Sequence, residues 1–267
     1  MDGAMDGAMD GAMDGAKVVR RGFITGAVSC AICAAASAGA AAAPGSLNPA
    51  VAHGAQDHGL PRHCGLDLAL SGGMNGRATR TRSSSGNVAL DRALIVEMMK
   101  VVAAFGINPG IKYLDDRRAP NAFATRRTIV EGTRGTIMLG LNLIRSELRT
   151  EWGGAAVAGI AAHEGAHIFQ LFSPFRRALT RGPTAREMEL HADLLAGWYF
   201  GETGRTGRSL QVFGRSLFAK GDFDFNDRTH HGTPEERLAA MELGFSFSQR
   251  GLTLMRAAEA GVDHVVA

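Results

Sequence analysis

The sequence predicts an α+β fold in which a small antiparallel sheet packs against a buried helix and a second helix that follows it. Three observations lead to this fold class. Short strand-like runs lie between residues 111 and 141, an almost uncharged helical run covers residues 153–172, and a helix-start signal stands at Thr184. The chain has 267 residues, of which 45% are hydrophobic and 21% charged, so it can bury a sizeable core.

Apolar residues recur at helical spacing over residues 88–105, and Gly106 follows as a stop signal. This pattern predicts an amphipathic helix. Three runs at residues 111–114, 121–125 and 136–141 are bounded by glycine, proline or charged turns, which is typical of short strands. We expect these strands to form the antiparallel sheet.

Residues 153–172 are apolar on every side of the predicted helix, and Glu164 is their only fully charged residue. A helix with this composition is buried. The next helix is predicted over residues 184–200, because the Thr-Ala-Arg-Glu run at its start has the spacing of a capping box. A last helix is predicted from Pro234 onward.

His163, Glu164 and His167 form an H-E-x-x-H pattern within the predicted buried helix. Positions i and i+4 share one helix face, so both imidazoles can bind one tetrahedral metal ion while Glu164 lies beside the remaining coordination position. Each buried polar group costs roughly 2 kcal/mol or more unless it is hydrogen-bonded or metal-bound. A metal site is therefore favoured over the alternative of three separately hydrogen-bonded core residues.

The helix over residues 184–200 offers a third ligand. Glu189 and Asp193 are again i and i+4, so both can point at the first helix. Glu189 would complete a His₂Glu site with water in the fourth position, and Asp193 would accept a hydrogen bond from the outer nitrogen of a ligand histidine. Glu187 and His191 compete with Glu189 for the ligand role, but Glu187 is better explained by the capping box and His191 points to the other side of the helix.

These two motifs resemble the gluzincin metallopeptidases, which carry H-E-x-x-H followed by E-x-x-x-D. The resemblance is greatest to the branch with CAAX prenyl endopeptidases, heat-shock membrane proteases and bacterial neutral zinc metallopeptidases. Residues 120–124 are similar to the edge strand of that branch, residues 135–143 to its next strand and helix start, and residues 231–237 to its late His-Pro-x-x-x-x-Arg element. The resemblance implies a zincin-like metallopeptidase domain.

The resemblance assigns the binding of one zinc ion per chain to His163, His167 and Glu189. It makes Glu164 the general base and His231 the candidate that holds the oxyanion, with His230 as a rival for that role. The sequence departs from the family at Gly232, where proline is usual, and this leaves the reach of His231 open.

The strand predicted near residue 121 is a candidate for binding an extended peptide as an added strand, with a covered strand as the alternative. The candidate substrate residues are Asn121, Ala122, Phe123 and Ala124. The sequence thus predicts a zinc-dependent endopeptidase that acts on a peptide or protein. Two alternatives remain: a zinc amide hydrolase that acts on cell-wall peptides, and a non-catalytic, chaperone-like zinc-binding protein.

The N-terminal 43 residues have the layout of a leader. Four Met-Asp-Gly-Ala repeats over residues 1–16 precede Lys17 and the pair Arg20 and Arg21, and residues 22–43 carry no charge. This order of a basic and then a weakly apolar segment resembles a twin-arginine export signal. We therefore expect a periplasmic or extracellular bacterial protein, with a general secretory signal or a retained anchor as alternatives.

Residues 44–87 lack periodicity and are predicted to form a flexible arm ahead of a metallopeptidase domain over residues 88–267. Three histidines of the arm recur at five-residue intervals beside Cys64 and could bind a metal, but this spacing does not place them on one helix face, so the predicted site does not include His53, His58 or His63. An inert linker is the favoured interpretation of this arm, and an inhibitory pro-segment is the alternative.

The net charge of the chain is close to neutral. Lys and Arg number 29 against 26 Asp and Glu, which gives +3, and removal of residues 1–43 takes away three basic and four acidic residues and gives +4. The basic residues are scattered, so no nucleic-acid partner is predicted. The multiple membrane spans of the prenyl and heat-shock relatives are not found in the sequence, so no stable membrane span is predicted after leader removal.

Overall fold

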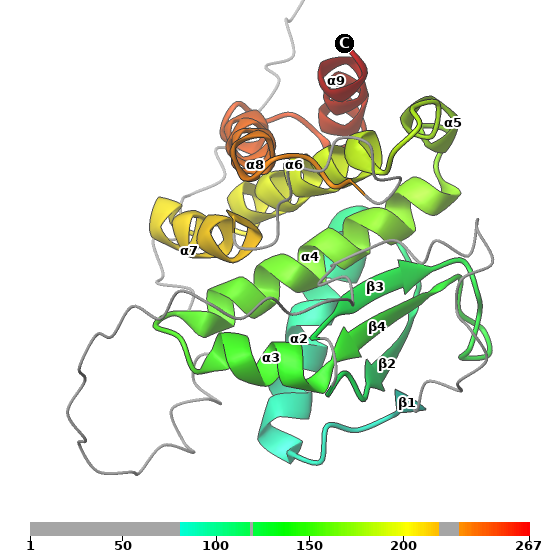
Figure 1. The fold of residues 1–267 in the computed structure, drawn as a ribbon, viewed down its shortest axis with the longest axis vertical. Helices are drawn as coiled ribbons and strands as arrows, with labels where there is room; N and C mark the ends of the chain where they lie inside the picture. The colour runs from blue at the N-terminus through cyan, green and yellow to red at the C-terminus, as the bar shows by residue number, and fades with distance from the viewer. Residues whose placement is uncertain (1–80, 118–119, 219–229) are drawn as a thin grey trace, which may run out of the picture.

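The computed structural model describes residues 81–117, 120–218 and 230–267, and the predicted leader and residues 44–80 of the arm, with His53, His58, His63 and Cys64, lie outside them. The described chain is α+β, as predicted, and most of its elements are helices (Figure 1). Its strands are β1 (Thr81–Arg82), β2 (Gly110–Leu114), β3 (Ala122–Thr125) and β4 (Thr136–Gly140). Its helices are α2 (Val88–Phe105), α3 (Leu141–Leu148), α4 (Gly153–Phe172), α5 (Arg176–Leu179), α6 (Arg186–Glu202), α7 (Gly207–Phe218), α8 (Pro234–Gln249) and α9 (Leu254–Val266).

The four strands form one mixed sheet in the order β1-β2-β4-β3. β1 pairs with β2 and β3 with β4 in antiparallel fashion, but β2 and β4 run parallel, with Gly110 opposite Thr136 and Leu114 opposite Gly140. The predicted all-antiparallel sheet is therefore wrong at its centre. The chain leaves β2, forms β3 at the edge of the sheet and returns between them as β4, a crossover that local strand signals do not reveal.

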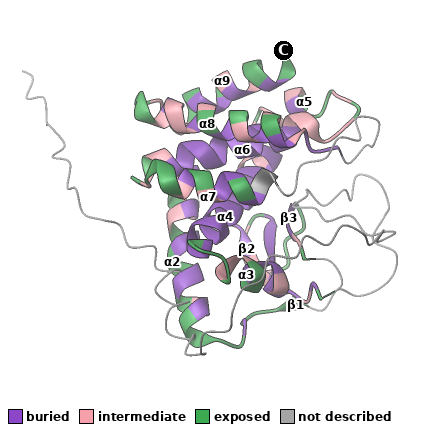
Figure 2. Ribbon diagram, turned by 60° about the vertical axis from the view of Figure 1, so that its left-hand side comes forward, coloured by how far each residue is buried: buried purple, intermediate pink, exposed green. Residues whose placement is uncertain are grey.

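Two predicted helices have the predicted bounds. Helix α2 begins after Asn87, whose side-chain oxygen accepts hydrogen bonds from the Ala89 and Leu90 amides, and it ends at Gly106 in the left-handed conformation with φ 61°. Helix α4 covers Gly153–Phe172 and is buried along nearly its whole length, as its uninterrupted apolar composition predicts (Figure 2).

The predicted capping box at the start of α6 is wrong. The helix begins after Ala185, which makes no side-chain cap, and the Thr184 hydroxyl accepts only the Arg186 amide at 3.3 Å. The Glu187 carboxylate lies beside Gly182 in the preceding turn instead of reaching back to the cap.

A capping box forms instead at the start of α8. There Thr233 and Glu236 exchange the two reciprocal hydrogen bonds, at 3.2 and 2.9 Å. Helix α8 is also not the last helix, because α9 follows after Gly251, which turns the chain with φ 76°.

Helix α4 lies between the sheet and a second group of helices that includes α6, α7, α8 and α9 (Figure 1). Helices α6 and α8 touch through their backbones at two glycines. A Cβ atom on Gly197 would lie 1.9 Å from the Met241 carbonyl oxygen, and one on Gly244 would lie 1.7 Å from the Leu194 carbonyl oxygen. This close contact brings the start of α8 against the ligand-bearing half of α6. Within the described ranges, no helix has the length and apolar composition needed to cross a bilayer.

Residues 81–87, at the end of the predicted arm, contact the rest of the domain through Asp91. The Asp91 carboxylate accepts hydrogen bonds from the Ser84 hydroxyl at 2.7 Å, the Ser85 amide at 2.9 Å and the Tyr113 hydroxyl at 2.7 Å. One side chain therefore connects this segment, the first turn of α2 and strand β2.

Candidate metal centre

Helices α4 and α6 bring three candidate ligands together. The Nε2 atoms of His163 and His167 lie 3.0 Å apart, and each lies 3.2 Å from one carboxylate oxygen of Glu189. All three side chains are at most 1% exposed. Among the described residues they form the group that can share one ion, and the rival ligands Glu187 and His191 are not part of it.

The distances between these atoms fit a shared metal ion. Two ligand atoms at roughly 2.0–2.1 Å from a tetrahedral ion lie about 3.3 Å from each other. The separations of 3.0 to 3.2 Å found here are close to that value. The buried group of His163, His167 and Glu189 can therefore bind a metal ion.

The outer nitrogen of His163 is held by a carboxylate. Its Nδ1 atom lies 2.8 Å from Asp193, at the position where a hydrogen bond orients a ligand histidine. Asp193 in turn accepts two hydrogen bonds from the buried Arg237 guanidinium, at 2.6 and 3.0 Å. Arg237 belongs to the late His-x-x-x-x-x-Arg stretch of the sequence, but no role was predicted for it.

The outer nitrogen of His167 is held by an amide that sequence reasoning missed. Its Nδ1 atom lies 2.7 Å from Oε1 of Gln170, one helical turn further along α4. The Gln170 amide nitrogen donates to the Met188 carbonyl at 2.8 Å and lies 2.9 Å from Nδ1 of His191. Spacing of i and i+3 after a ligand histidine was the available signal for Gln170.

Charges within the group perturb its pKa values strongly. Burial acts to lower the pKa of His163, but the neighbouring Asp193 and Glu189 carboxylates prevail and raise it to about 10. Burial acts to raise the pKa of Glu189, yet His167 and His231 hold it well below its usual range. A metal ion would therefore displace a proton from His163 on binding. Burial lowers the pKa of His191 to about 4, so this ring is neutral.

The other predicted residues are close to this group. Glu164 is fully buried on α4 beside His163, and Nδ1 of His231 lies 3.4 Å from a Glu189 oxygen. His230 is also buried. Between them and α8, Gly232 has φ 89°, which proline with its fixed φ near −65° does not adopt. Proline could therefore not take the place of Gly232 without a change in the backbone here.

Strand β3 lies at one edge of the described sheet and packs against α4. The Gly140 amide donates to the Asn121 carbonyl at 3.0 Å, so the alternation of an antiparallel pair directs the backbone polar groups of Ala122 and Ala124 away from β4. Asp116 anchors this edge, because it accepts the Asn121 amide at 3.1 Å and the first free amides of α3 at 2.7 and 2.9 Å. The role of Asp116 was not predicted.

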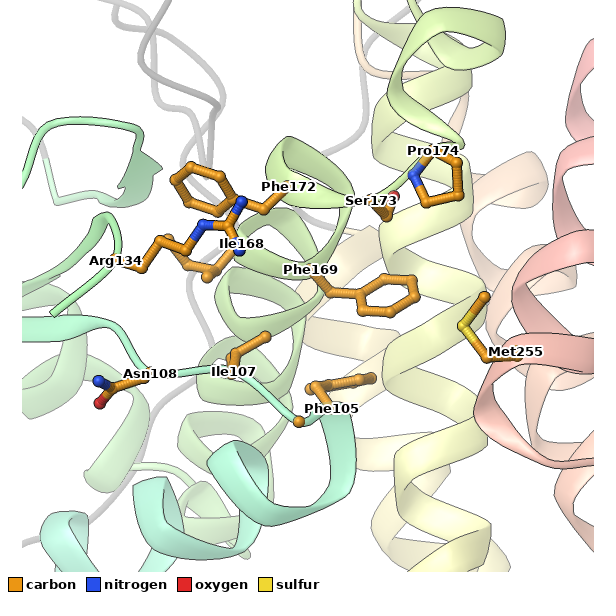
Figure 3. A pocket seen from close by; sticks show the side chains of 11 residues that line it. Phe105, Ile107, Asn108, Arg134, Ile168, Phe169, Phe172, Ser173, Pro174 and Met255 are labelled. Atoms are coloured by element: carbon orange, nitrogen blue, oxygen red, sulfur yellow. The ribbon is translucent and has the colours of Figure 1, made fainter.

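A pocket of about 360 Å³ lies on the opposite face of α4 (Figure 3). Ile168, Phe169 and Phe172 line it and leave the helix on the side away from His163 and His167. The Arg134 guanidinium lies over the Phe172 ring, 4.4 Å from its centroid. This pocket is separate from the candidate metal centre.

Comparisons of the chain with protein-family models, with curated proteins and with solved structures gave no match.

Proposed function

We propose that this protein is an exported zinc-dependent endopeptidase with a zincin-like domain that hydrolyses peptide bonds in peptides or proteins. One observation carries the proposal: the Nε2 atoms of His163 and His167 lie 3.0 Å apart and each lies 3.2 Å from an oxygen of Glu189, and Glu164 directly follows His163 on helix α4. The resemblance of the two helix motifs to gluzincins supports the same activity.

The donor set fits zinc in particular. Two imidazoles and one carboxylate are the ligands of catalytic zinc sites that keep a fourth position open, whereas magnesium and calcium prefer sites built from oxygen alone. In such a site zinc supplies a bound water with a pKa lowered toward 7 and polarises the carbonyl that is attacked.

The residues of the chain perform the remaining steps. Glu164 accepts the proton of the attacking water and passes it to the leaving amine. Asp193 holds Nδ1 of His163, so that its Nε2 faces the metal position, and His231 donates a hydrogen bond to the developing oxyanion. Ala122 and Ala124 on β3 are 0% exposed, so an extended substrate pairs with their outward backbone groups only where this edge is uncovered, and such pairing gives affinity with little dependence on the substrate's sequence.

The leader supports a location outside the cytoplasm. The pair Arg20 and Arg21 followed by an uncharged, Ala-rich segment is typical of twin-arginine export, so the working protein is periplasmic or extracellular. Such a location gives access to extracellular peptides and to cell-wall peptides. Digestion of casein beside digestion of peptidoglycan distinguishes an endopeptidase from a cell-wall amide hydrolase.

The Glu164→Gln variant tests the mechanism. We expect it to retain about one zinc ion per chain and to lose casein hydrolysis by roughly 10²-fold to 10⁴-fold, the usual contribution of a general base. Glu187→Gln is the matched control, because it makes the same chemical change on α6 outside the group of three ligands. Equal hydrolysis by Glu164→Gln and the wild-type protein would contradict the proposed role, and a purified wild-type protein without zinc would contradict the site.

A further inference from the structure

We propose that Gln170 and His191 are positioning residues that hold His167 with its Nε2 lone pair toward the metal position, and that helix α9 anchors them. The inference rests on the proposed metal centre and extends it to the C-terminal helix. It is carried by a series of hydrogen bonds that runs from His167 to Gln170, both on α4, then to His191 on α6 and to the Ala258 carbonyl on α9.

The direction of every hydrogen bond in this chain is determined by its ends. The Ala258 carbonyl can only accept, so the Nε2 atom of His191, 2.9 Å away, carries a proton. In a neutral ring Nδ1 of His191 is then an acceptor and takes one N–H of the Gln170 amide, 2.9 Å away. The second N–H of Gln170 goes to the Met188 carbonyl at 2.8 Å.

This arrangement leaves Oε1 of Gln170 for His167. An amide oxygen can only accept, so Nδ1 of His167, 2.7 Å from it, carries the proton. In the neutral form that binds a metal ion, a ring with its proton on Nδ1 has its lone pair on Nε2, the atom that faces His163 and Glu189. The hydrogen-bond chain thus selects the tautomer of His167 that a metal requires.

Packing holds this series of hydrogen-bonded side chains in place. Gln170 and His191 are fully buried, and a Cβ atom on Gly261 of α9 would lie 3.0 Å from Cδ2 of His191. Helix α9 therefore presses directly on the imidazole through a position without a side chain. Loss of Gln170 or His191 would leave buried polar atoms without hydrogen bonds, at a cost in free energy. The hydrogen-bond series therefore has a single favourable arrangement.

The two ligand histidines are held differently. His163 faces a carboxylate that is paired with Arg237, whereas His167 faces a neutral amide whose chain ends on a backbone carbonyl. A carboxylate can orient a histidine alone, but the symmetric shape of an amide needs a further partner to fix which end faces the ring. The Met188 carbonyl and Nδ1 of His191 together supply that constraint for Gln170.

Zinc affinity, measured by chelator competition, and histidine ¹⁵N NMR test this inference in the full chain without its leader. We expect Gln170→Met and His191→Phe each to weaken zinc binding by about 10-fold to 100-fold, as loss of an orienting partner does. Tyr199→Phe is the matched control, because it removes another buried hydrogen bond of α6, to Glu97, away from the ligands. It should lower stability and leave zinc affinity unchanged.

The NMR measurement separates positioning from a merely structural role. In the metal-free wild-type protein we expect a proton on Nδ1 of His167 and on Nε2 of His191, and Gln170→Met should lose the preference at His167. The opposite tautomers in the wild-type protein, or unchanged zinc affinity in both folded variants, would overturn the inference. This wild-type measurement decides the matter if neither variant folds. A wild-type protein that binds zinc with these tautomers but cleaves no peptide would contradict only the proposed activity.

Discussion

Asp193 joins the metal ligand His163 to the buried cation Arg237 through a single carboxylate. Burial acts to raise the pKa of Asp193, but Arg237 and His163 keep it below its usual value. Its negative charge therefore serves two purposes. It orients the imidazole, and it neutralises a guanidinium that is only 1% exposed.

The Asp193→Asn substitution should lower both the stability of the fold and the affinity for zinc. Removing the charge leaves Arg237 buried without a full counter-ion, so we expect the free energy of unfolding to fall by about 3 kcal/mol or more. Zinc affinity should also fall by about 10-fold to 100-fold because His163 loses its anionic partner. Urea unfolding and chelator competition measure the two effects. Asp263→Asn, at an exposed position on α9, is the control and should change neither quantity.

The three metal ligands could be predicted from the sequence. The residues that orient the two ligand histidines could be predicted only in part. Spacing of i and i+4 on two helices is enough to bring His163, His167 and Glu189 to facing surfaces. Asp193 follows from the same periodicity. Gln170 had a signal in its i and i+3 spacing after His167, but the role of His191 could not be predicted, because its partner Ala258 is 67 residues further along the chain and the contact depends on how α9 packs.

At the scale of elements, glycine contacts control how closely the helices approach. Gly165, inside the H-E-x-x-H motif, is close to α2, since a Cβ atom there would lie 2.3 Å from a Val101 methyl group. A Cβ atom on Gly197 would lie 1.9 Å from the Met241 carbonyl oxygen of α8, and a rigid backbone cannot move aside as a side chain does.

Gly197→Ala should therefore be destabilising despite the higher helix propensity of alanine. We expect a loss of about 1–3 kcal/mol in the free energy of unfolding, because α8 must move away from α6. Thermal or urea unfolding measures the loss. Gly207→Ala is the control at the start of α7, where an added Cβ atom has nothing within 4 Å, and it should be neutral or slightly stabilising. Equal stability of the two variants would show that the contact between α6 and α8 is looser than described.

Asp91 makes the attachment of residues 81–87 depend on pH. Burial acts to raise its pKa, but hydrogen bonds from Tyr113, Ser84 and Ser85 lower it from 3.8 to about 2. A carboxylate with a depressed pKa stabilises the fold fully above its unfolded value of about 4 and loses that contribution as pH falls toward 2.

We therefore expect the difference in unfolding free energy between the wild-type protein and Asp91→Asn to be constant from pH 7 to about 4 and to shrink below it. Urea unfolding at pH 7, 5, 4 and 3 measures this difference. A gap that stays constant down to pH 3 would mean that the three hydrogen bonds to Asp91 do not depend on its charge.

Helices and strands were predicted correctly where local sequence signals are strong. The prediction was wrong where contacts between distant residues determine the structure. The bounds of α2 follow from apolar residues at helical spacing and from Gly106, and those of α4 from an uninterrupted apolar run. The parallel pairing of β2 and β4 depends on the path of the chain through β3, which strand composition does not encode. The Thr184 capping box failed because Glu187 turns toward Gly182 instead.

At the scale of the whole molecule, the ligand group connects elements that are far apart in the sequence. His163 and His167 come from α4, Glu189 from α6, and Arg237 and His231 contact Glu189 from α8 and the segment before it. These helices cover the side of α4 that faces away from the sheet (Figure 1). A metal ion at this point would link helices α4 and α6. We therefore expect its removal to lower the free energy of unfolding of the whole domain.

Metal removal should lower the melting temperature of the wild-type protein. An ion that binds only the folded state at about 1,000 times its Kd adds about 4 kcal/mol, or about 10 °C for a domain of this size. Calorimetry with zinc and with a chelator measures the shift. Glu189→Gln, which keeps the size of the side chain and removes a ligand charge, should melt at nearly the same temperature in both conditions.

The shift should also shrink as pH falls, because protons compete with the ion for His163, whose pKa in the metal-free protein is about 10. Chelation that leaves the wild-type transition unmoved, or moves that of Glu189→Gln equally, would show that the ion is not bound at this junction.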